Sequence, residues 1–206
     1  MSVERVDFLV EEPSMEAALQ AMLPSWLGEL EFAVFPHQGK QDLLHNLPSR
    51  LKGYGRFLPP TWRIVVLVDR DDGNCKALKK QLEDAAVSAN LRTRSTSRDG
   101  SYQVANRVVI EEIESWYFGD WDAVRMAFPK IDSKWPGKAG YRDPDAIAGG
   151  TWEAFERVAQ AAGYFKGGLR KVDAAKRIGA HLDPIRNTSR SFQAFRRVID
   201  ELISGR

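Results

Sequence analysis

The most distinctive hydrophobic segment of the chain is residues 64–68, Ile-Val-Val-Leu-Val. Five consecutive apolar residues, mostly β-branched, are too few for a typical helix. They suit a strand that is buried on both faces, as in a parallel sheet. Residues 6–10 and 31–35 form two further runs of strand-forming residues, and residues 102–110 predict a fourth strand.

Apolar residues recur at helical spacing between these strands and after the last one. Strands that alternate with helices in this way predict an α/β protein, with a central, mostly parallel sheet flanked by helices. Ser14 is the expected cap of the first helix, and Asp72 is the expected cap of the helix after the third strand. One expected helix follows Ser14. The others span residues 40–51, 75–89, 111–128, 151–162, 171–182 and 189–203.

Residues 132–150 are rich in Gly, Pro and charge, so they mark the expected boundary between two parts of the chain. Residues 1–132 would form the α/β domain, and residues 133–206 a helical C-terminal extension packed on it. The first part holds 16 Lys+Arg and 20 Asp+Glu, the second 14 and 8, so the net charges of −4 and +6 add to +2. This asymmetry suggests a metal-holding centre beside a surface that attracts an anionic polymer. Ordinary variation in surface charge is the alternative.

The overall composition, with 43% apolar and 28% charged residues, is that of an ordinary globular protein. The single cysteine, Cys75, excludes an intramolecular disulfide and a Cys-rich zinc site. There is no apolar run long enough to span a bilayer and no secretory signal at the N-terminus. We therefore expect a cytoplasmic protein without a membrane partner.

Acidic residues follow three of the four predicted strands. Glu11 follows the first strand, Asp69 and Asp71 follow the third, and Glu112 with Glu114 follows the fourth. Ligands of open α/β sheets bind outside the carboxyl ends of the strands, where these side chains would meet. Carboxylates gathered there repel one another unless a cation neutralises them, and Mg²⁺ or Mn²⁺ is the cation that favours such ligands. Taken singly, each cluster could instead be a solvated turn or a helix cap.

These segments also carry a resemblance to a known fold. Residues 8–14, Phe-Leu-Val-Glu-Glu-Pro-Ser, resemble the strand and following glutamate of the Toprim fold, and residues 68–71, Val-Asp-Arg-Asp, resemble its Asp-x-Asp motif. The chain is identified as a member of an uncharacterised bacterial family of Toprim-like proteins, domain of unknown function 4276. The motifs that carry this assignment lie at residues 11–16, 35–42, 68–72 and 112–116, and the similarity continues through residues 142–145 and 189–192.

The resemblance implies roles for individual residues. Glu11 matches the Toprim glutamate, which acts in acid/base chemistry and helps to hold metal, and Asp69 and Asp71 match the metal-binding aspartates. Glu112 and Glu114 lie where the related nucleases of the overcoming-lysogenization-defect class place further metal ligands. One departure is that Glu12 stands where those nucleases usually have glycine. Another is that their later Thr-Glu becomes Ser14-Met15, so the way a second metal is held stays open.

Basic residues supply the remaining candidates. Lys40 follows Gly39 at the predicted start of a helix, where it would stabilise charge on a phosphate; a solvated lysine in a tight turn is the alternative. An aromatic group after the last acidic cluster favours core packing over stacking on bases, and it consists of Trp116, Tyr117, Phe118 and Trp121. The basic residues expected to contact nucleic acid are Lys40, Arg92, Arg94, Arg142, Lys166, Arg170 and Lys171.

Taken together, these features predict a Toprim-type, metal-dependent phosphodiesterase that acts on DNA or RNA, as in bacterial anti-phage defence. Glu11 and Lys40 would be its catalytic residues. One alternative is an effector or regulatory subunit of an ATPase-containing defence complex. The chain has no Gly-x-x-x-x-Gly-Lys-Ser/Thr phosphate loop, so the ATPase would be a separate chain encoded nearby. Another alternative is a nucleic-acid-binding module without catalysis.

Overall fold

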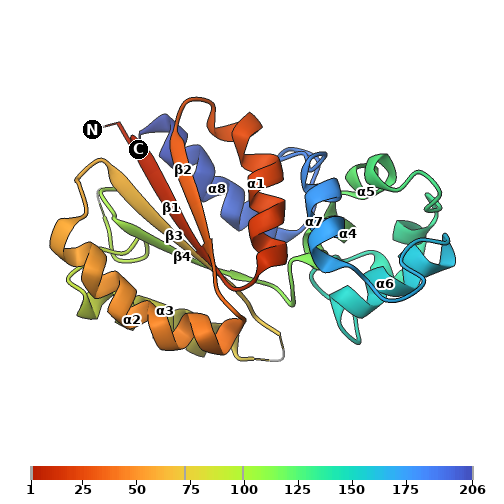
Figure 1. Cartoon of the computed structure of the whole chain (residues 1–206), viewed down its shortest axis with the longest axis horizontal. Helices are drawn as coiled ribbons and strands as arrows, with labels where there is room; N and C mark the ends of the chain where they lie inside the picture. Colours follow the sequence, from red (N-terminus) through yellow and green to blue (C-terminus); the bar gives the residue numbers. More distant parts are fainter. Residues whose placement is uncertain (1, 72, 99, 206) are drawn as a thin grey trace.

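A computed structural model describes residues 2–71, 73–98 and 100–205. Its centre is a four-stranded sheet in the order β2-β1-β3-β4, in which every neighbouring pair is parallel (Figure 1). This confirms the predicted α/β class and the parallel sheet. The strands are β1 (Arg5–Val10), β2 (Glu31–Pro36), β3 (Trp62–Asp69) and β4 (Val104–Val109).

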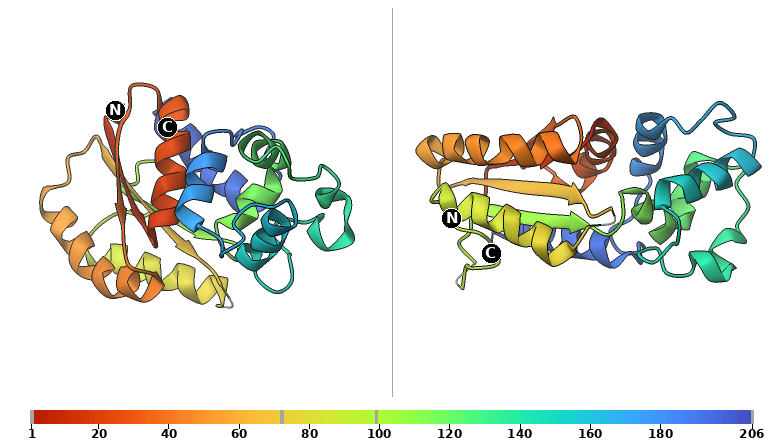
Figure 2. Two further views of the ribbon diagram at one scale, coloured as in Figure 1. Left: turned by 45° about the vertical axis from the view of Figure 1, so that its right-hand side comes forward. Right: turned by 90° about the horizontal axis from the view of Figure 1, so that it is seen from below.

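Helices cover both faces of the sheet, which explains why the central strands are apolar on both sides. Phe8 and Val65 point into a core shared with α1 (Pro13–Leu27) and α8 (Arg190–Ser204). Leu9 and Val66 point to the other face, which α2 (Lys40–Phe57) and α3 (Cys75–Ser88) cover (Figure 1 and Figure 2).

The remaining helices form a lobe beside the carboxyl ends of the strands, on the right in Figure 1. Two short 3-10 helices, at residues 135–137 and 139–141, belong to the same part of the chain. The α-helices of the lobe are α4 (Glu114–Gly119), α5 (Trp121–Ala127), α6 (Thr151–Ala161) and α7 (Lys171–Gly179).

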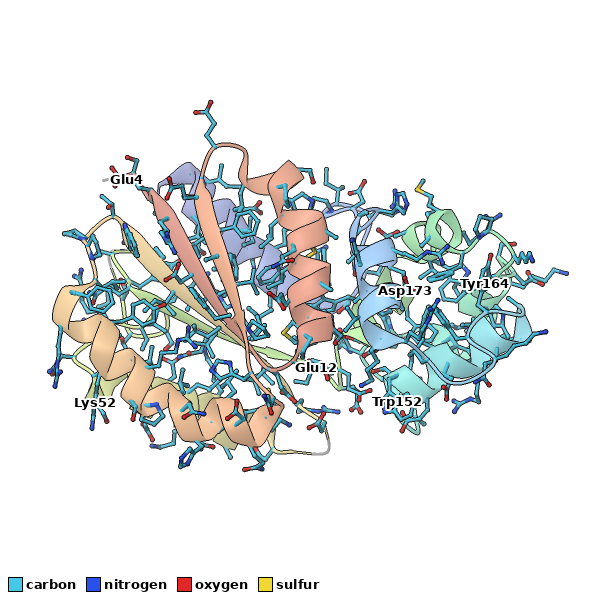
Figure 3. All side chains as sticks on the ribbon, in the orientation of Figure 1. Glu4, Glu12, Lys52, Trp152, Tyr164 and Asp173 are labelled. Carbon is cyan, nitrogen blue, oxygen red and sulfur yellow. The ribbon has the colours of Figure 1, made fainter. Side chains whose placement is uncertain are left out.

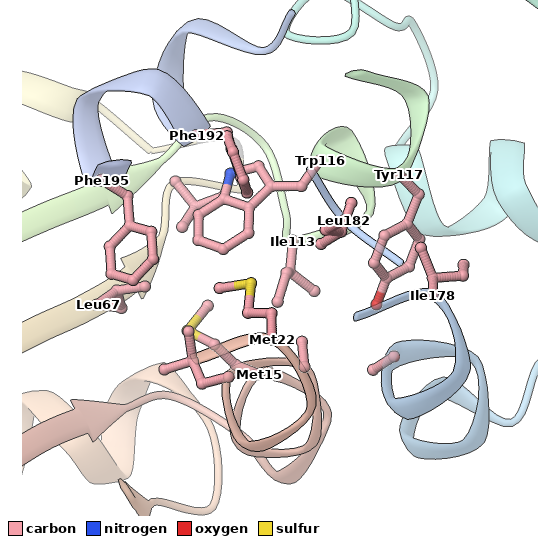
Figure 4. Packing of buried hydrophobic residues seen from close by; sticks show 14 of the residues in the cluster. Met15, Met22, Leu67, Ile113, Trp116, Tyr117, Ile178, Leu182, Phe192 and Phe195 are labelled. Atoms are coloured by element: carbon pink, nitrogen blue, oxygen red, sulfur yellow. The ribbon is translucent and has the colours of Figure 1, made fainter. Parts of the chain in front are cut away.

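The C-terminal residues share one continuous core with the sheet. Trp116 of α4 packs against Phe192 and Phe195 of α8, with ring centroids 5.1 and 5.3 Å apart (Figure 4). Trp116, Tyr117 and Phe118 are all buried, which confirms that these aromatic residues pack in the core. The boundary between residues 132 and 133 stays a prediction.

Three details of the predicted elements were wrong. Helix α1 begins at Pro13, so Ser14 lies inside its first turn and bonds the Glu12 carboxylate instead of capping the helix. Helix α2 runs six residues beyond 51, to Phe57, because Tyr54 continues its buried face. The helix expected over residues 111–128 begins at Glu114 and is interrupted at Asp120, whose side chain accepts from the Ala123 N–H and caps a separate helix.

The predicted cap of the helix after β3, Asp72, lies outside the described residues. Asn74 caps α3: its side-chain oxygen accepts hydrogen bonds from the backbone N–H groups of Lys76 and Ala77, both at 3.0 Å. In the part of the chain that the structure describes, none of the helices has the length and apolar character needed to traverse a bilayer.

Candidate metal centre

Three carboxylates lie at the carboxyl edge of the sheet. Glu11 follows the last residue of β1, Asp69 ends β3, and Glu114 begins α4 shortly after β4. Strands β1, β3 and β4 are parallel neighbours, so their ends bring these residues to one place. The exposed fractions are only 8% for Glu11, 4% for Asp69 and 1% for Glu114. Burial of three acidic side chains at one edge of the sheet costs free energy unless a cation or hydrogen-bond donors compensate for the lost hydration.

The protonation equilibria reflect this cost. Burial raises the pKa of Glu114 to about 8, against the opposing effect of Lys171. Burial also raises the pKa of Glu11 to about 7, although the Asp69 N–H and Lys40 both lower it. The pKa of Asp69 lies well above its usual range, first because of burial and then because of repulsion from Glu11 and Glu114. Glu11 and Glu114 therefore disfavour the ionised form of Asp69, which lies between them in the order of strands.

Several oxygens of this cluster have no hydrogen-bond partner. Within the described residues, these are Oδ1 of Asp69 and both side-chain oxygens of Glu114. Glu11, in contrast, accepts a hydrogen bond from the backbone N–H of Asp69 at 3.0 Å. Unpartnered, buried carboxylate oxygens are the donor type that Mg²⁺ and Mn²⁺ prefer. The residues present therefore fit a hard divalent cation.

The ligand set is not assembled in advance. Across residues 2–71, 73–98 and 100–205, no three His, Cys, Asp or Glu side chains are grouped closely enough to hold a metal ion. The side chains of Glu11, Asp69 and Glu114 would have to converge on a cation. Repulsion between carboxylates is a physical reason for them to stay apart without one.

Asp71 and Lys40 form an ion pair at the rim of this cluster. The Asp71 backbone is in the left-handed region, with φ 47°, and its side chain is 51% exposed. Lys40 Nζ lies 2.5 Å from Oδ2 of Asp71 and donates to the carbonyl oxygen of Arg70 at 3.0 Å. The turn after β3 thus directs the Asp71 carboxylate towards Lys40.

Glu112 caps a helix of the lobe. Its Oε2 accepts hydrogen bonds from the Trp152 N–H at 3.0 Å and from the Thr151 hydroxyl at 3.1 Å, in the first turn of α6. Its Oε1 lies 3.9 Å from Nζ of Lys171, the first residue of α7. Burial by itself lowers the pKa of Lys171, but the carboxylates of Glu114, Glu12 and Glu112 outweigh it, so the pKa is raised.

A cavity of about 470 Å³ opens beside Glu112, at the turns that follow β3 and β4. Asp71, Glu111 and Glu112 line one side of it, and residues 147–150 with Trp152 and Glu153 line the other. Gly149 and Gly150 have φ values of 80° and 83°, which allow the chain to turn into α6. Sequence reasoning identified the helix but not this wall of the cavity, because only the fold places residues 147–153 opposite the turn after β3.

The sequence pattern of the family described as "Domain of unknown function (DUF4276)" matches residues 10–202. The chain belongs to the DUF4276 family. No curated protein and no solved structure matches it. The family match spans every residue of the carboxylate cluster, but the description assigns the family no activity.

The other basic residues that sequence reasoning selected in this DUF4276 protein lie away from the carboxylates. Arg92 and Arg94 precede β4, at its amino end, where Arg94 Nε lies 2.6 Å from a Glu201 oxygen. Arg170 pairs with Asp173 at 3.1 Å. Arg142 donates to the carbonyl oxygen of Gly137 at 3.3 Å, and Lys166 is exposed in the loop between α6 and α7. The fold therefore brings two of the selected cations, Lys40 and Lys171, to the cluster.

Sequence reasoning did not connect the hydroxyl of Tyr117 with the carboxylate cluster. This residue lies one helical turn after Glu114 on α4, and it is fully buried. Its hydroxyl has no hydrogen-bond partner within the described residues, and burial together with the charge of Glu114 raises its pKa. The only sequence signal was the spacing of three residues from an acidic side chain, which places both on one face of a helix.

Proposed function

We propose that this DUF4276 protein is a metal-dependent phosphodiesterase of the Toprim type that cleaves DNA or RNA. The observation that carries the proposal is the set of buried carboxylates Asp69, Glu114 and Glu11, three of whose oxygens have no partner within the described residues. Burial of acidic groups without partners destabilises a fold. Such groups are found mainly at functional sites, where they take part in binding or catalysis.

The residues would divide the work as follows. Asp69 and Glu114, with Glu11 and Asp71, would hold Mg²⁺ or Mn²⁺. A divalent ion bound there would polarise the scissile phosphate and lower the pKa of a bound water. Glu11 would either bind the ion or transfer a proton during the reaction. Lys40, once released from Asp71, would stabilise negative charge on the phosphate.

The direct test is cleavage of plasmid DNA, single-stranded DNA and tRNA in the presence of Mg²⁺ or Mn²⁺. We expect activity that EDTA removes and that Asp69→Asn abolishes. Asp84→Asn is the matched control, because Asp84 is exposed and forms a surface ion pair with Lys80 on α3. Activity that is unaffected by Asp69→Asn would refute the proposal.

A second candidate, an effector subunit activated by a separate ATPase, is favoured by the Lys40–Asp71 ion pair. The ion pair engages both side chains. A rearrangement must therefore separate them before Asp71 binds a metal ion or Lys40 binds a phosphate. An ATPase encoded nearby would drive that change in a cytoplasmic anti-phage complex. Co-purification with the neighbouring gene product, and cleavage that appears only when it is added, would support this candidate.

The third candidate, a binding module without catalysis, makes a different prediction. Nucleic-acid affinity would persist without turnover, and it would be unchanged when Asp69 and Asp71 are both replaced by alanine. Loss of cleavage in that double variant, from a wild-type protein that does cleave, would exclude this candidate.

A further inference from the structure

A second cavity, of about 370 Å³, lies in the lobe at the C-terminal end of α6. It is lined by Lys130, Lys134, Trp135, Lys138 and Asp132, with Ala161 and Ala162 at the end of the helix. We call the surface formed by Lys130, Lys134, Trp135 and Lys138 the lysine groove. None of these residues belongs to the carboxylate cluster.

The lysine groove carries unneutralised positive charge. All three lysines are exposed, and none of them forms an ion pair within the described residues. The one carboxylate in the cavity, Asp132, accepts a hydrogen bond from the backbone N–H of Lys134 at 2.8 Å. Three ammonium groups against one carboxylate leave an excess of two positive charges, which suits a ligand with several negative charges.

Trp135 supplies an aromatic surface in the same groove. Its ring is half-buried and lies in a T-shaped contact with Tyr141, at 5.4 Å between centroids. Tyr141 in turn stacks on the buried Phe118 at 5.4 Å, so the tryptophan is anchored to the core. Nζ of Lys138 lies over the face of the Trp135 ring, 3.5 Å from its centroid. Because Lys138 is exposed, a base can displace it from the ring and leave the ammonium group to contact a phosphate of the same strand.

Helix α6 connects the lysine groove with the candidate metal centre. Its first turn donates to Glu112, and its last residue lines the groove. The 11 residues of α6 span about 16 Å at 1.5 Å per residue. Figure 3 labels Trp152 near the sheet end of α6 and Tyr164 beyond its far end, where the Tyr164 hydroxyl accepts from the Lys130 N–H at 3.3 Å. A ligand that occupies both places must be a polymer.

We propose that the lysine groove binds a single-stranded segment of the nucleic acid whose phosphodiester lies at the carboxylates. A base would stack on Trp135, while Lys130, Lys134 and Lys138 contact phosphates. The location of the cut strand rests on the proposed function, whereas the groove's affinity for the strand does not. A single strand is favoured over a duplex because stacking on Trp135 requires an unpaired base.

The test measures binding by fluorescence anisotropy, in EDTA, to single strands of DNA and RNA of about 16 nucleotides and to the DNA duplex. Replacing three phosphate-contacting lysines should make the negative slope of log affinity against log salt less steep by about 2. Trp135→Ala should lower affinity about tenfold or more, and Trp135→Phe should retain most of it. The triple variant carries Lys130→Gln, Lys134→Gln and Lys138→Gln, and its charge-matched control carries Lys52→Gln, Lys76→Gln and Lys176→Gln.

The outcomes separate the inference from the proposed function. Metal-dependent hydrolysis of a small chromogenic phosphodiester should be the same in the groove variants and the wild type, because that substrate does not reach the groove. Strand binding that depends on the groove, in a protein that cleaves nothing, would support the inference and refute the phosphodiesterase. Cleavage with unchanged strand affinity in the groove variants would overturn the inference alone. Equally tight, groove-dependent binding of the duplex would also overturn it.

Discussion

The carboxylate of Glu11 accepts a hydrogen bond from the backbone N–H of Asp69, at 3.0 Å across the ends of two neighbouring strands. This contact fixes one oxygen of Glu11 beside the Asp69 residue while leaving Oδ1 of Asp69 without a partner in the described structure. The two acidic groups are thus held together although the charge of Glu11 opposes ionisation of Asp69. A cation between them would remove the conflict.

Asp69→Asn should therefore separate stability from activity. The amide keeps the shape of the side chain and removes the free-energy cost of burying an acidic group beside other carboxylates, so we expect the metal-free protein to gain about 1 kcal/mol of unfolding free energy. For a chain of this size, that gain raises the melting temperature by about 2–4 °C. Thermal unfolding in EDTA measures the gain. Cleavage should fall by more than about 100-fold.

The response to metal provides the control for this variant. Saturating Mg²⁺ or Mn²⁺ should raise the melting temperature of the wild-type protein, since a ligand that binds only the folded state stabilises it. Asp69→Asn should lose this increase, and Asp84→Asn should keep it. An equal increase in both variants would mean that the ion binds elsewhere.

The stability of the metal-free protein should fall as the pH rises. Glu114 has a pKa of about 8 in the folded protein against 4.5 as its ordinary value. Between these two pH values, Glu114 binds fewer protons in the unfolded chain than in the folded protein. The contribution of its protonation to the free energy of unfolding is therefore fully present below about pH 4.5 and is lost as the pH rises through about 8. Glu11 and Asp69, whose pKa values are also raised, act in the same direction.

Urea unfolding in EDTA at several pH values measures this effect. We expect the free energy of unfolding to decrease by a few kcal/mol between about pH 5 and about pH 8. Glu114→Gln should reduce the slope, because the amide does not titrate. A wild-type protein and a variant with the same slope would contradict the assignment of this pH dependence to Glu114.

Lys171→Met should tighten metal binding and weaken catalysis. The ammonium group lies 3.9 Å from Glu112 and interacts with Glu114 and Asp69, so it competes with a cation for the same carboxylates. Its removal should lower the Mn²⁺ dissociation constant several-fold. Cleavage should nevertheless slow if the lysine also stabilises the phosphate.

Isothermal titration with Mn²⁺ and steady-state cleavage measure the two effects. Lys176→Met, on an exposed position of the same helix, is the control and should change neither. Weaker Mn²⁺ binding in Lys171→Met would show that the lysine does not oppose the cation.

Gly179→Ala should destabilise the contact between α1 and α7. A Cβ atom at Gly179 would lie 2.8 Å from the carbonyl oxygen of Ala18 and 3.1 Å from its Cα, so the two helices would have to move apart. Overpacking of this kind costs about 1–3 kcal/mol, and chemical denaturation measures it. Gly167→Ala is the control, since nothing lies within 4 Å of its Cβ position. Equal stabilities for the two variants would contradict the close helix packing.

Local patterns in the sequence are enough to predict the sheet and the position of its acidic edge. Strands buried on both faces of a parallel sheet must be apolar throughout, so residues 64–68 predict a central strand. All strands of such a sheet end at the same edge. Residues that follow separate strands, Glu11, Asp69 and Glu114, can therefore be placed together from the order of residues along the chain. This inference needs only local pattern and the direction of the chain.

What each acidic side chain contacts depends on the tertiary structure. Glu112 and Glu114 are two residues apart and appear equivalent in the sequence, yet one caps α6 and the other is buried without a partner in the described chain. Lys171, 59 residues after Glu112, reaches the cluster because α7 packs against α1. Hydrogen bonds and ion pairs act over a few ångströms, so they depend on which distant segments the core brings together, and local sequence patterns do not encode that choice.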